Sequence, residues 1–294
     1  MELLWLGHPD AHRAALVGGK AAQLSQLTGQ HRVPHGFCLT TAAHDLAMRH
    51  QHSLPESLYQ RLAAAYAALA EHVGQGNPSV AVRSSAADED GATASFAGQH
   101  ETFLNIRGLG PLAHAVRRCW ESAYAPRALA YRRQHGVETP PRVAVLIQHL
   151  VAADVSAVVF SANPITGARD EVLINASWGL GESIVGGTVT PDTYIVRKRD
   201  LLPAARHVCE KRRMTVSVSG GTREVDVPQA LRLRPALNDA GAAEIAGLAV
   251  ALEAQLGWPV DIECAFEQGT LYLLQCRPIT RLGPLRLHTA RQPA

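Results

Sequence analysis

Two neighbouring runs near the end of the chain, WPVDIECAF (258–266) and TLYLLQCR (270–277), alternate between apolar and polar residues. A turn containing Gly269 separates them, so together they predict a β-hairpin. Every second residue of the first run from position 260 is apolar, which leaves Asp261 and Glu263 together on the opposite face of that strand. In the second run Gln275 and Arg277 likewise share a face.

The register of this hairpin decides which polar side chains meet. If residues 268–270 form a three-residue loop, Glu263 lies opposite Gln275 and Asp261 lies opposite Arg277. Carboxylate and amide oxygens suit Mg²⁺, and a neighbouring arginine can bind nucleotide phosphates through two parallel hydrogen bonds. The alternative is a solvated face with an ordinary cross-strand ion pair.

The rest of the chain predicts a mixture of helices and strands. Apolar residues recur at helical spacing over 56–73 and 238–256. Asn238 or Asp239 can cap the second helix, and Gly257 can end it in a left-handed conformation. Short runs rich in Val and Ile at 79–82, 143–147, 155–160 and 172–174 predict buried strands. The expected fold class is therefore α/β or mixed α+β.

The segment VRSSAADEDGATASFAGQ (82–99) is almost without bulky side chains. A strand that ends in Arg83 and continues into small residues can bring backbone N–H groups and a guanidinium close to phosphate oxygens. A flexible exposed loop is the alternative. The Gly-Gly-Lys sequence ending at Lys20 is not a P-loop, because Ala21 stands where that motif needs Ser or Thr, and alone it indicates only a surface helix start.

Other local patterns argue against several functions. The glycine-rich run 179–187 fails the dinucleotide fingerprint because Ile184 occupies the third glycine position. The fourteen histidines form no metal-binding motif. The basic residues within 197–213 are interrupted by acidic ones and favour a solvated hairpin.

Composition sets the broad class of the protein. With 294 residues and 47% hydrophobic residues, the chain is long enough for a large core. Its net charge of +2 provides no general attraction for nucleic acid. The five cysteines contain no C-x-x-C pair, which favours a reducing, cytoplasmic location. No signal peptide or membrane span is expected.

Taken in order, the motifs resemble the nucleotide-binding domain of phosphoenolpyruvate synthase, pyruvate phosphate dikinase and rifampin phosphotransferase. The matching stretches are 18–24, 33–41, 82–106, 175–192 and 261–278. The resemblance implies an ATP-grasp fold, in which two α/β lobes clamp ATP. We expect an N-terminal lobe at 1–105 with a phosphate-covering loop, a C-terminal lobe at 106–281 with the adenine and magnesium sites, and a tail at 282–294.

The same resemblance implies roles for individual residues. Glu263 and Gln275 would bind Mg²⁺, while Lys20, Arg83 and Arg277 would act on the phosphoryl groups as catalytic residues. The expected ATP-binding residues are Lys20, Arg83, Gly98, Gln148, His149, Leu150, Glu182 and Arg277. Among them, residues 148–150 would contact adenine and Gly98 would belong to the phosphate-covering loop.

In this family ATP is converted to AMP, and its β-phosphoryl group passes to a histidine on a separate swivelling domain. The sequence contains no family-type phosphohistidine segment, in which a glycine-rich stretch ends in Ser or Cys followed by His. We therefore expect an ATP-binding domain that phosphorylates a histidine on a separate partner protein. Three alternatives stay open: direct phosphorylation or pyrophosphorylation of a small molecule, a non-catalytic ATP-binding module, and a carboxylate-amine ligase, for which ADP would be the product.

Overall fold

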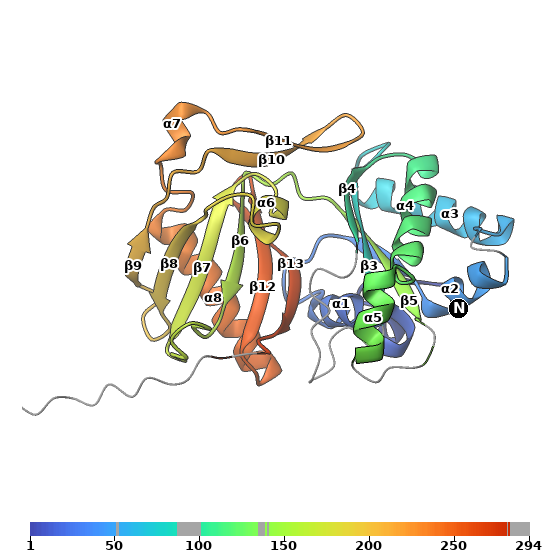
Figure 1. Cartoon of the computed structure of the whole chain (residues 1–294), viewed down its shortest axis with the longest axis horizontal. Coiled ribbons are helices and arrows are strands. Elements are labelled where there is room, and N and C mark those ends of the chain that lie inside the picture. Colours follow the sequence, from blue (N-terminus) through green and yellow to red (C-terminus); the bar gives the residue numbers. More distant parts are fainter. Residues whose placement is uncertain (51–52, 87–100, 135–138, 140, 281, 283–294) are drawn as a thin grey trace, which may run out of the picture.

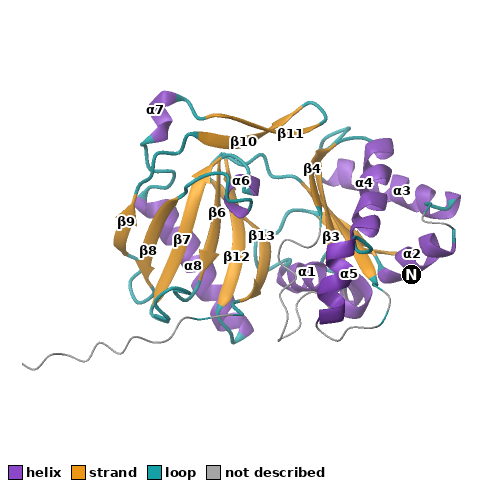
Figure 2. Ribbon diagram, viewed as in Figure 1, coloured by secondary structure: helices purple, strands orange, loops and turns teal. Residues whose placement is uncertain are grey.

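Two β-sheets with helices packed on them lie side by side in the computed structural model of this chain (Figure 1). The structure describes residues 1–50, 53–86, 101–134, 139, 141–280 and 282. Helices and strands are interspersed along the chain (Figure 2), which confirms the mixed α/β fold class expected from the sequence. Among the described residues, no helix combines the length and the apolar character needed to cross a lipid bilayer.

The first lobe is a five-stranded antiparallel sheet with its helices. The strand order is β1-β2-β5-β3-β4. The strands are β1 (Leu3–Trp5), β2 (Gly36–Leu39), β3 (Val80–Ala86), β4 (Thr102–Ile106) and β5 (Val143–His149). The helices are η1 (Pro9–His12), α1 (Ala14–Leu27), α2 (Thr41–Arg49), α3 (Glu56–His72), α4 (Leu109–Ser122) and α5 (Pro126–Gln134). Helix α3 confirms the helical spacing predicted over 56–73, and with α4 it buries leucines and Trp120 against the sheet.

The second lobe is a six-stranded antiparallel sheet with order β13-β12-β6-β7-β8-β9. The strands are β6 (Val155–Phe160), β7 (Glu171–Trp178), β8 (Asp192–Arg197), β9 (Pro203–His207), β12 (Val260–Glu267) and β13 (Thr270–Pro278). Helix α8 (Asp239–Leu256) packs on this sheet. Asn238 caps the helix by accepting the Gly241 N–H at 2.8 Å, and Gly257 ends it at φ 78°, as the sequence predicts.

Three smaller elements lie beside the second sheet. They are the short helices α6 (Glu182–Val185) and α7 (Gln229–Arg232), and the separate antiparallel hairpin of β10 (Arg213–Val218) and β11 (Gly221–Asp226). In Figure 1 this hairpin extends from the second lobe toward β4 of the first.

The chain crosses from one sheet to the other between His149 and Val155. Strand β5 pairs with β2 and β3, and helix α4 contacts β3, β4 and β5, so both elements belong with the first sheet. A lobe boundary drawn by sheet membership therefore falls near residue 150 and corrects the boundary after residue 105. The earlier boundary followed glycine and proline punctuation, which marks turns but does not reveal which strands pair.

Helix α1 joins the two lobes. It packs against β3 and β5 of the first sheet and also against β13 of the second. After the helix, the Arg32 carbonyl accepts a hydrogen bond from the Leu273 N–H at 2.9 Å. The hydrophobic core under the second sheet therefore includes Leu24 and Leu27 from the N-terminal part of the chain.

Candidate nucleotide site

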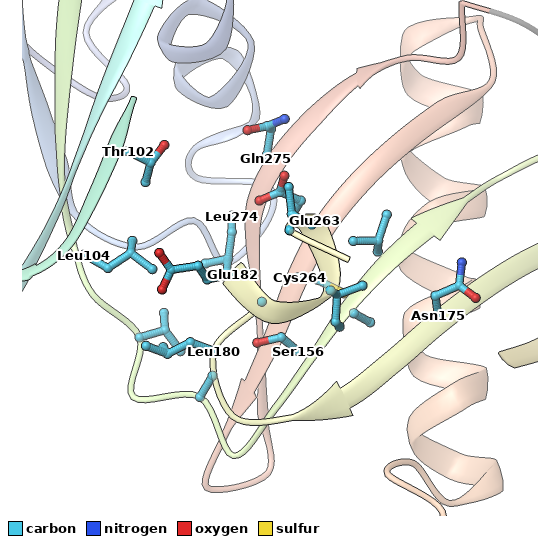
Figure 3. Close-up of a pocket in the computed structure, with 18 of the residues that line it drawn as sticks. Thr102, Leu104, Ser156, Asn175, Leu180, Glu182, Glu263, Cys264, Leu274 and Gln275 are labelled. Atoms are coloured by element: carbon cyan, nitrogen blue, oxygen red, sulfur yellow. The ribbon is translucent and has the colours of Figure 1, made fainter. Parts of the chain in front are cut away.

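A cavity of about 920 Å³ lies between the two lobes and is lined by residues of both. Its lining includes the predicted site residues Lys20, Arg83, Gln148, His149, Leu150, Glu182, Glu263, Gln275 and Arg277. Figure 3 shows Glu263 and Gln275 on neighbouring strands, with Thr102 and Leu104 of the other lobe across from them. Gly98, the remaining predicted residue, lies outside the described residues. The structure thus brings together side chains that are more than 250 positions apart in the sequence.

The hairpin of β12 and β13 has the predicted register but a different turn. Glu263 pairs with Gln275 and Asp261 pairs with Arg277. The loop contains two residues, Gln268 at φ 50° and Gly269 at φ 77°, where three were predicted. A register shift after Glu263 leaves Leu274 as an extra residue in β13. This β-bulge compensates for the shorter turn, so the predicted pairs were right although the predicted loop length was wrong.

Asp261 holds the guanidinium of Arg277 in place. The Asp261 Oδ2 atom accepts a hydrogen bond from Arg277 Nε at 2.9 Å and forms an ion pair with a terminal nitrogen of the same guanidinium at 2.8 Å. Burial raises the pKa of the Asp261 carboxyl, while the charge and hydrogen bond of Arg277 act in the opposite direction. Asp261 is the more deeply buried partner, with 10% of its side chain exposed against 31% for Arg277. The arginine therefore lines the cavity while its guanidinium is held by a buried carboxylate.

Arg83 spans the space between the lobes. It lies on β3 of the first sheet, and its terminal nitrogen donates to the Leu274 carbonyl of β13 at 3.0 Å. Its other terminal nitrogen lies 3.9 Å from Glu263 Oε2. The acceptor is the carbonyl of the bulge residue itself, so the irregularity that sets the hairpin register also provides a contact for Arg83.

The position of Lys20 depends on a break in helix α1 at Gly18. This residue has φ 76° and ψ 165°, and a Cβ atom there would lie 2.1 Å from the Ser85 carbonyl oxygen. The second part of the helix therefore starts against β3, where Ser85 Oγ accepts the Ala21 N–H at 3.2 Å and Lys20 Nζ donates to the Ser84 carbonyl at 3.4 Å. Gly18 is thus buried against β3, while Gly19 and Lys20 are half-buried and Lys20 lines the cavity.

Residues 148–150 line the cavity where the chain leaves the first sheet. The Gln148 side chain is buried and its Nε2 donates to the Pro34 carbonyl at 3.1 Å. The N–H groups of His149 and Leu150 donate to the carbonyls of His35 and Ser79. Burial lowers the pKa of His149, which favours the neutral imidazole.

Glu182 begins α6, directly after the loop Gly179-Leu180-Gly181. Ser156 Oγ donates to the Gly179 carbonyl at 2.7 Å and so ties this loop to β6. The Glu182 carboxylate accepts a hydrogen bond from Thr222 Oγ1 of β11 at 2.9 Å. The family resemblance predicts Glu182 near the nucleotide, but nothing in the sequence predicts its hydrogen bond with Thr222.

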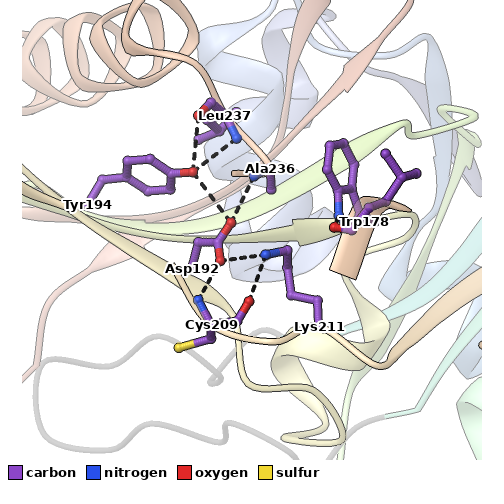
Figure 4. Close-up of polar contacts among 8 residues, drawn as sticks. Trp178, Asp192, Tyr194, Cys209, Lys211, Ala236 and Leu237 are labelled. Carbon is purple, nitrogen blue, oxygen red and sulfur yellow. Dashed lines mark hydrogen bonds and ion pairs between the residues drawn. The ribbon is translucent and has the colours of Figure 1, made fainter. Parts of the chain in front are cut away.

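Sequence reasoning missed a buried ion pair beside the cavity (Figure 4). Lys211 Nζ donates to Asp192 Oδ1 at 2.6 Å, and neither side chain is exposed. Asp192 also accepts the N–H groups of Cys209 at 2.9 Å and Ala236 at 2.8 Å. The solvated hairpin predicted for residues 197–213 is therefore wrong at Lys211. Asp192, in the matching stretch 175–192, was the available signal, but its partner could not be read from the sequence.

The donor atoms of Glu263 and Gln275 fit a magnesium ion. They offer a carboxylate oxygen and an amide oxygen from adjacent positions on paired strands. No group of three or more His, Cys, Asp or Glu suited to holding a metal occurs in the part of the chain that the structure describes. Mg²⁺ commonly takes only one or two protein ligands and completes its octahedron with water and substrate phosphates, so two protein oxygens are sufficient.

Comparison with known proteins shows the family to which this chain belongs. The family model described as "Pyruvate phosphate dikinase, AMP/ATP-binding domain" matches residues 46–292. The chain is 42% identical to a probable phosphoenolpyruvate synthase of Methanocaldococcus jannaschii over 231 residues, covering 78% of this chain and 19% of that protein. It is 35% identical to a rifampicin phosphotransferase of Streptomyces sviceus over 310 residues, covering 94% of this chain and 35% of that protein.

A phosphoenolpyruvate synthase of Pyrococcus furiosus is 39% identical over 239 residues, covering 78% of this chain and 29% of that protein. The chain thus spans less than half the length of these curated relatives. The matched region includes Arg83, the loop before Glu182 and the hairpin of β12 and β13, which line the cavity described above. The chain belongs to the family of the pyruvate phosphate dikinase AMP/ATP-binding domain.

Proposed function

We propose that this chain binds Mg-ATP between its two lobes, as in an ATP-grasp enzyme, and passes the β-phosphoryl group to a histidine of a separate domain or partner protein. The observation that carries the proposal is the convergence of Lys20, Arg83 and Arg277 with the Glu263–Gln275 pair on one cavity. Cations supplied by both lobes can neutralise a triphosphate, which a single exposed arginine cannot do.

Each group has a definite part in this proposal. Lys20 and Arg83 bind phosphate oxygens. Arg277, which forms an ion pair with Asp261, stays in contact with the phosphoryl group while it is transferred. Residues 148–150 contact adenine, and Glu182 lies near the nucleotide. Glu263 and Gln275 would hold Mg²⁺, which supplies positive charge to the phosphate oxygens.

The transfer depends mainly on the alignment of the reacting groups, and less on covalent chemistry by the protein. The bond between the β-phosphorus and the oxygen that bridges it to the α-phosphorus breaks, AMP leaves with that oxygen, and a histidine nitrogen bonds to the β-phosphorus. The bond between the terminal phosphorus and its bridging oxygen also breaks, and the terminal phosphoryl group goes to water or to inorganic phosphate. Because ATP and reduced cysteines are both cytoplasmic features, a cytoplasmic location is part of the proposal.

Direct phosphorylation of a small molecule is the second candidate. It is favoured by the similarity to the rifampicin phosphotransferase of Streptomyces sviceus, since that name describes a small-molecule acceptor. In this version the acceptor reaches the cavity without a protein histidine between them.

Incubation of the purified chain with β-labelled Mg-ATP and an extract of its source cells separates these functions. Acid-labile label on a protein supports the histidine acceptor, and label on a small product other than a nucleotide supports the second candidate. Release of ADP instead of AMP would point to a ligase, and binding without turnover would point to a non-catalytic module. Arg83→Lys should reduce turnover strongly, since a lysine lacks the planar fork of donors.

A further inference from the structure

The β10–β11 hairpin extends from the second lobe to β4 of the first lobe (Figure 1). Its base lies in the second lobe, where the buried Asp192–Lys211 pair fixes the chain just before β10. Its turn reaches β4 of the first lobe. A segment tied at both ends to different lobes can transmit the position of one lobe to the other.

In the first lobe, Asn105 of β4 makes hydrogen bonds to the hairpin. Asn105 Nδ2 donates to the carbonyls of Val218 at 2.6 Å and Gly221 at 2.7 Å, which flank the hairpin turn. Asn105 Oδ1 accepts a hydrogen bond from Ser79 Oγ at 2.6 Å. Asn105 is 4% exposed, and its φ of 57° is a conformation that asparagine tolerates better than most residues.

The contacts in the second lobe are made with the loop that leads to Glu182. The Thr215 carbonyl of β10 accepts the Leu180 N–H at 2.9 Å. Gly179 approaches the same carbonyl so closely that a Cβ atom would lie 2.4 Å from it. Thr222 Oγ1 of β11 donates to the Glu182 carboxylate at 2.9 Å. The hairpin therefore holds both the backbone of this loop and the side chain that faces the cavity.

We infer that Asn105 is a positioning residue for nucleotide binding, which acts through the β10–β11 hairpin on Glu182. With the hairpin docked on Asn105, Thr222 holds the Glu182 carboxylate at the cavity. With the hairpin released, the loop 179–182 loses that restraint, although its own lobe is intact. The inference rests on the cavity being the nucleotide site and does not require phosphoryl transfer.

Asn105→Asp and Thr222→Val test the two ends of this connection. Asn105→Asp keeps the shape of the side chain, the Ser79 contact and the tolerance of positive φ. It replaces the donating amide nitrogen with an oxygen that faces the two carbonyl oxygens of the hairpin turn. Thr222→Val removes only the hydroxyl group, at a partly exposed position where the fold should tolerate it. Thr222→Ser keeps the hydroxyl and serves as the conservative rescue.

Asn77→Asp is the matched control for the charge change. Asn77 is exposed, and its Oδ1 accepts from the Tyr66 hydroxyl at 2.7 Å, a bond that a carboxylate keeps. The first measurement is hydrogen exchange without nucleotide. Asn105→Asp should speed exchange in segments 179–186 and 214–226 and leave α8 unchanged, whereas Asn77→Asp should change none of them.

The second measurement is ATP affinity by calorimetry. Asn105→Asp and Thr222→Val should each weaken binding by about tenfold, and the double variant should be no weaker than the worse single variant. Thr222→Ser should bind as the unmodified chain does. The inference would be overturned if segment 179–186 of Asn105→Asp exchanged at the wild-type rate. It would also be overturned if the double variant lost ATP affinity by the product of the two single losses. Loss of phosphoryl transfer with these results intact would instead contradict the proposed function.

Discussion

Glu263 on β12 lies directly opposite Gln275 on β13, in a register set jointly by a two-residue turn and by the β-bulge at Leu274. The side-chain period of a strand is two, so a shift of one residue would move Gln275 to the other face of the sheet. The bulge compensates for the short turn and keeps both oxygen donors at the cavity. It also places the carbonyl that accepts the hydrogen bond from Arg83.

Glu263→Gln should lower phosphoryl transfer by about 100-fold or more, because the variant loses the carboxylate charge that we assign to magnesium binding. The melting temperature should change little, since the side chains have nearly the same shape. Initial rates of AMP formation over a range of Mg²⁺ concentrations measure the effect. Glu171→Gln, on β7 and outside the cavity lining, is the control and should keep its rate. Equal rates for all three proteins would remove Glu263 from the site.

Gly18→Ala should destabilise the fold by about 3 kcal/mol or more, because its Cβ would meet the Ser85 backbone and its φ is positive. Gly110→Ala in α4 is the matched change, with no atom within 4 Å of the added Cβ. It should be neutral or stabilising by about 0.5 kcal/mol. Urea unfolding compares the two, and similar losses would contradict the close approach of α1 to β3.

Lys211→Met should lower the free energy of unfolding by about 3–5 kcal/mol, because it leaves the Asp192 carboxylate buried without its cation. Lys198→Met removes an ion pair of the same 2.6 Å length, between Lys198 and Glu253, whose side chains are 17% and 27% exposed. That change should cost less than about 1 kcal/mol. Chemical denaturation of both variants tests the difference, and a small loss at Lys211 would count against a buried pair.

His149 should make the protein less stable in mild acid. Burial, with smaller contributions from His35 and Arg107, lowers its pKa from the ordinary value of 6.5, and Glu267 acts in the opposite direction. Below 6.5 the unfolded chain binds this proton more readily than the folded one, so the free energy of unfolding falls as the pH falls toward the lowered value.

Melting temperatures between about pH 7.5 and 5.5 measure this dependence. His149→Asn should show a shallower decline than the unmodified chain, whereas His12→Asn, at an exposed position, should leave the decline unchanged. A decline that is the same in all three proteins would assign the acid sensitivity to other groups.

Local patterns determined much of this protein. Helical spacing predicted α3 and α8, together with the cap at Asn238 and the end at Gly257. Alternation predicted the hairpin and put Asp261 and Glu263 on one face, because side-chain direction in a strand follows from position alone. These features depend on residues close together in the chain, so the local sequence is enough to predict them.

The tertiary structure decided what depends on distant partners. The pairing of β5 with β2 and β3 assigned this strand to the first lobe, which no local signal indicates. The bulge at Leu274, the burial of Lys211 against Asp192 and the docking of the hairpin on Asn105 likewise join separate segments. Such contacts depend on how whole sheets pack, because the free energy of burying or pairing a side chain is set by its neighbours in space and not by its neighbours in sequence.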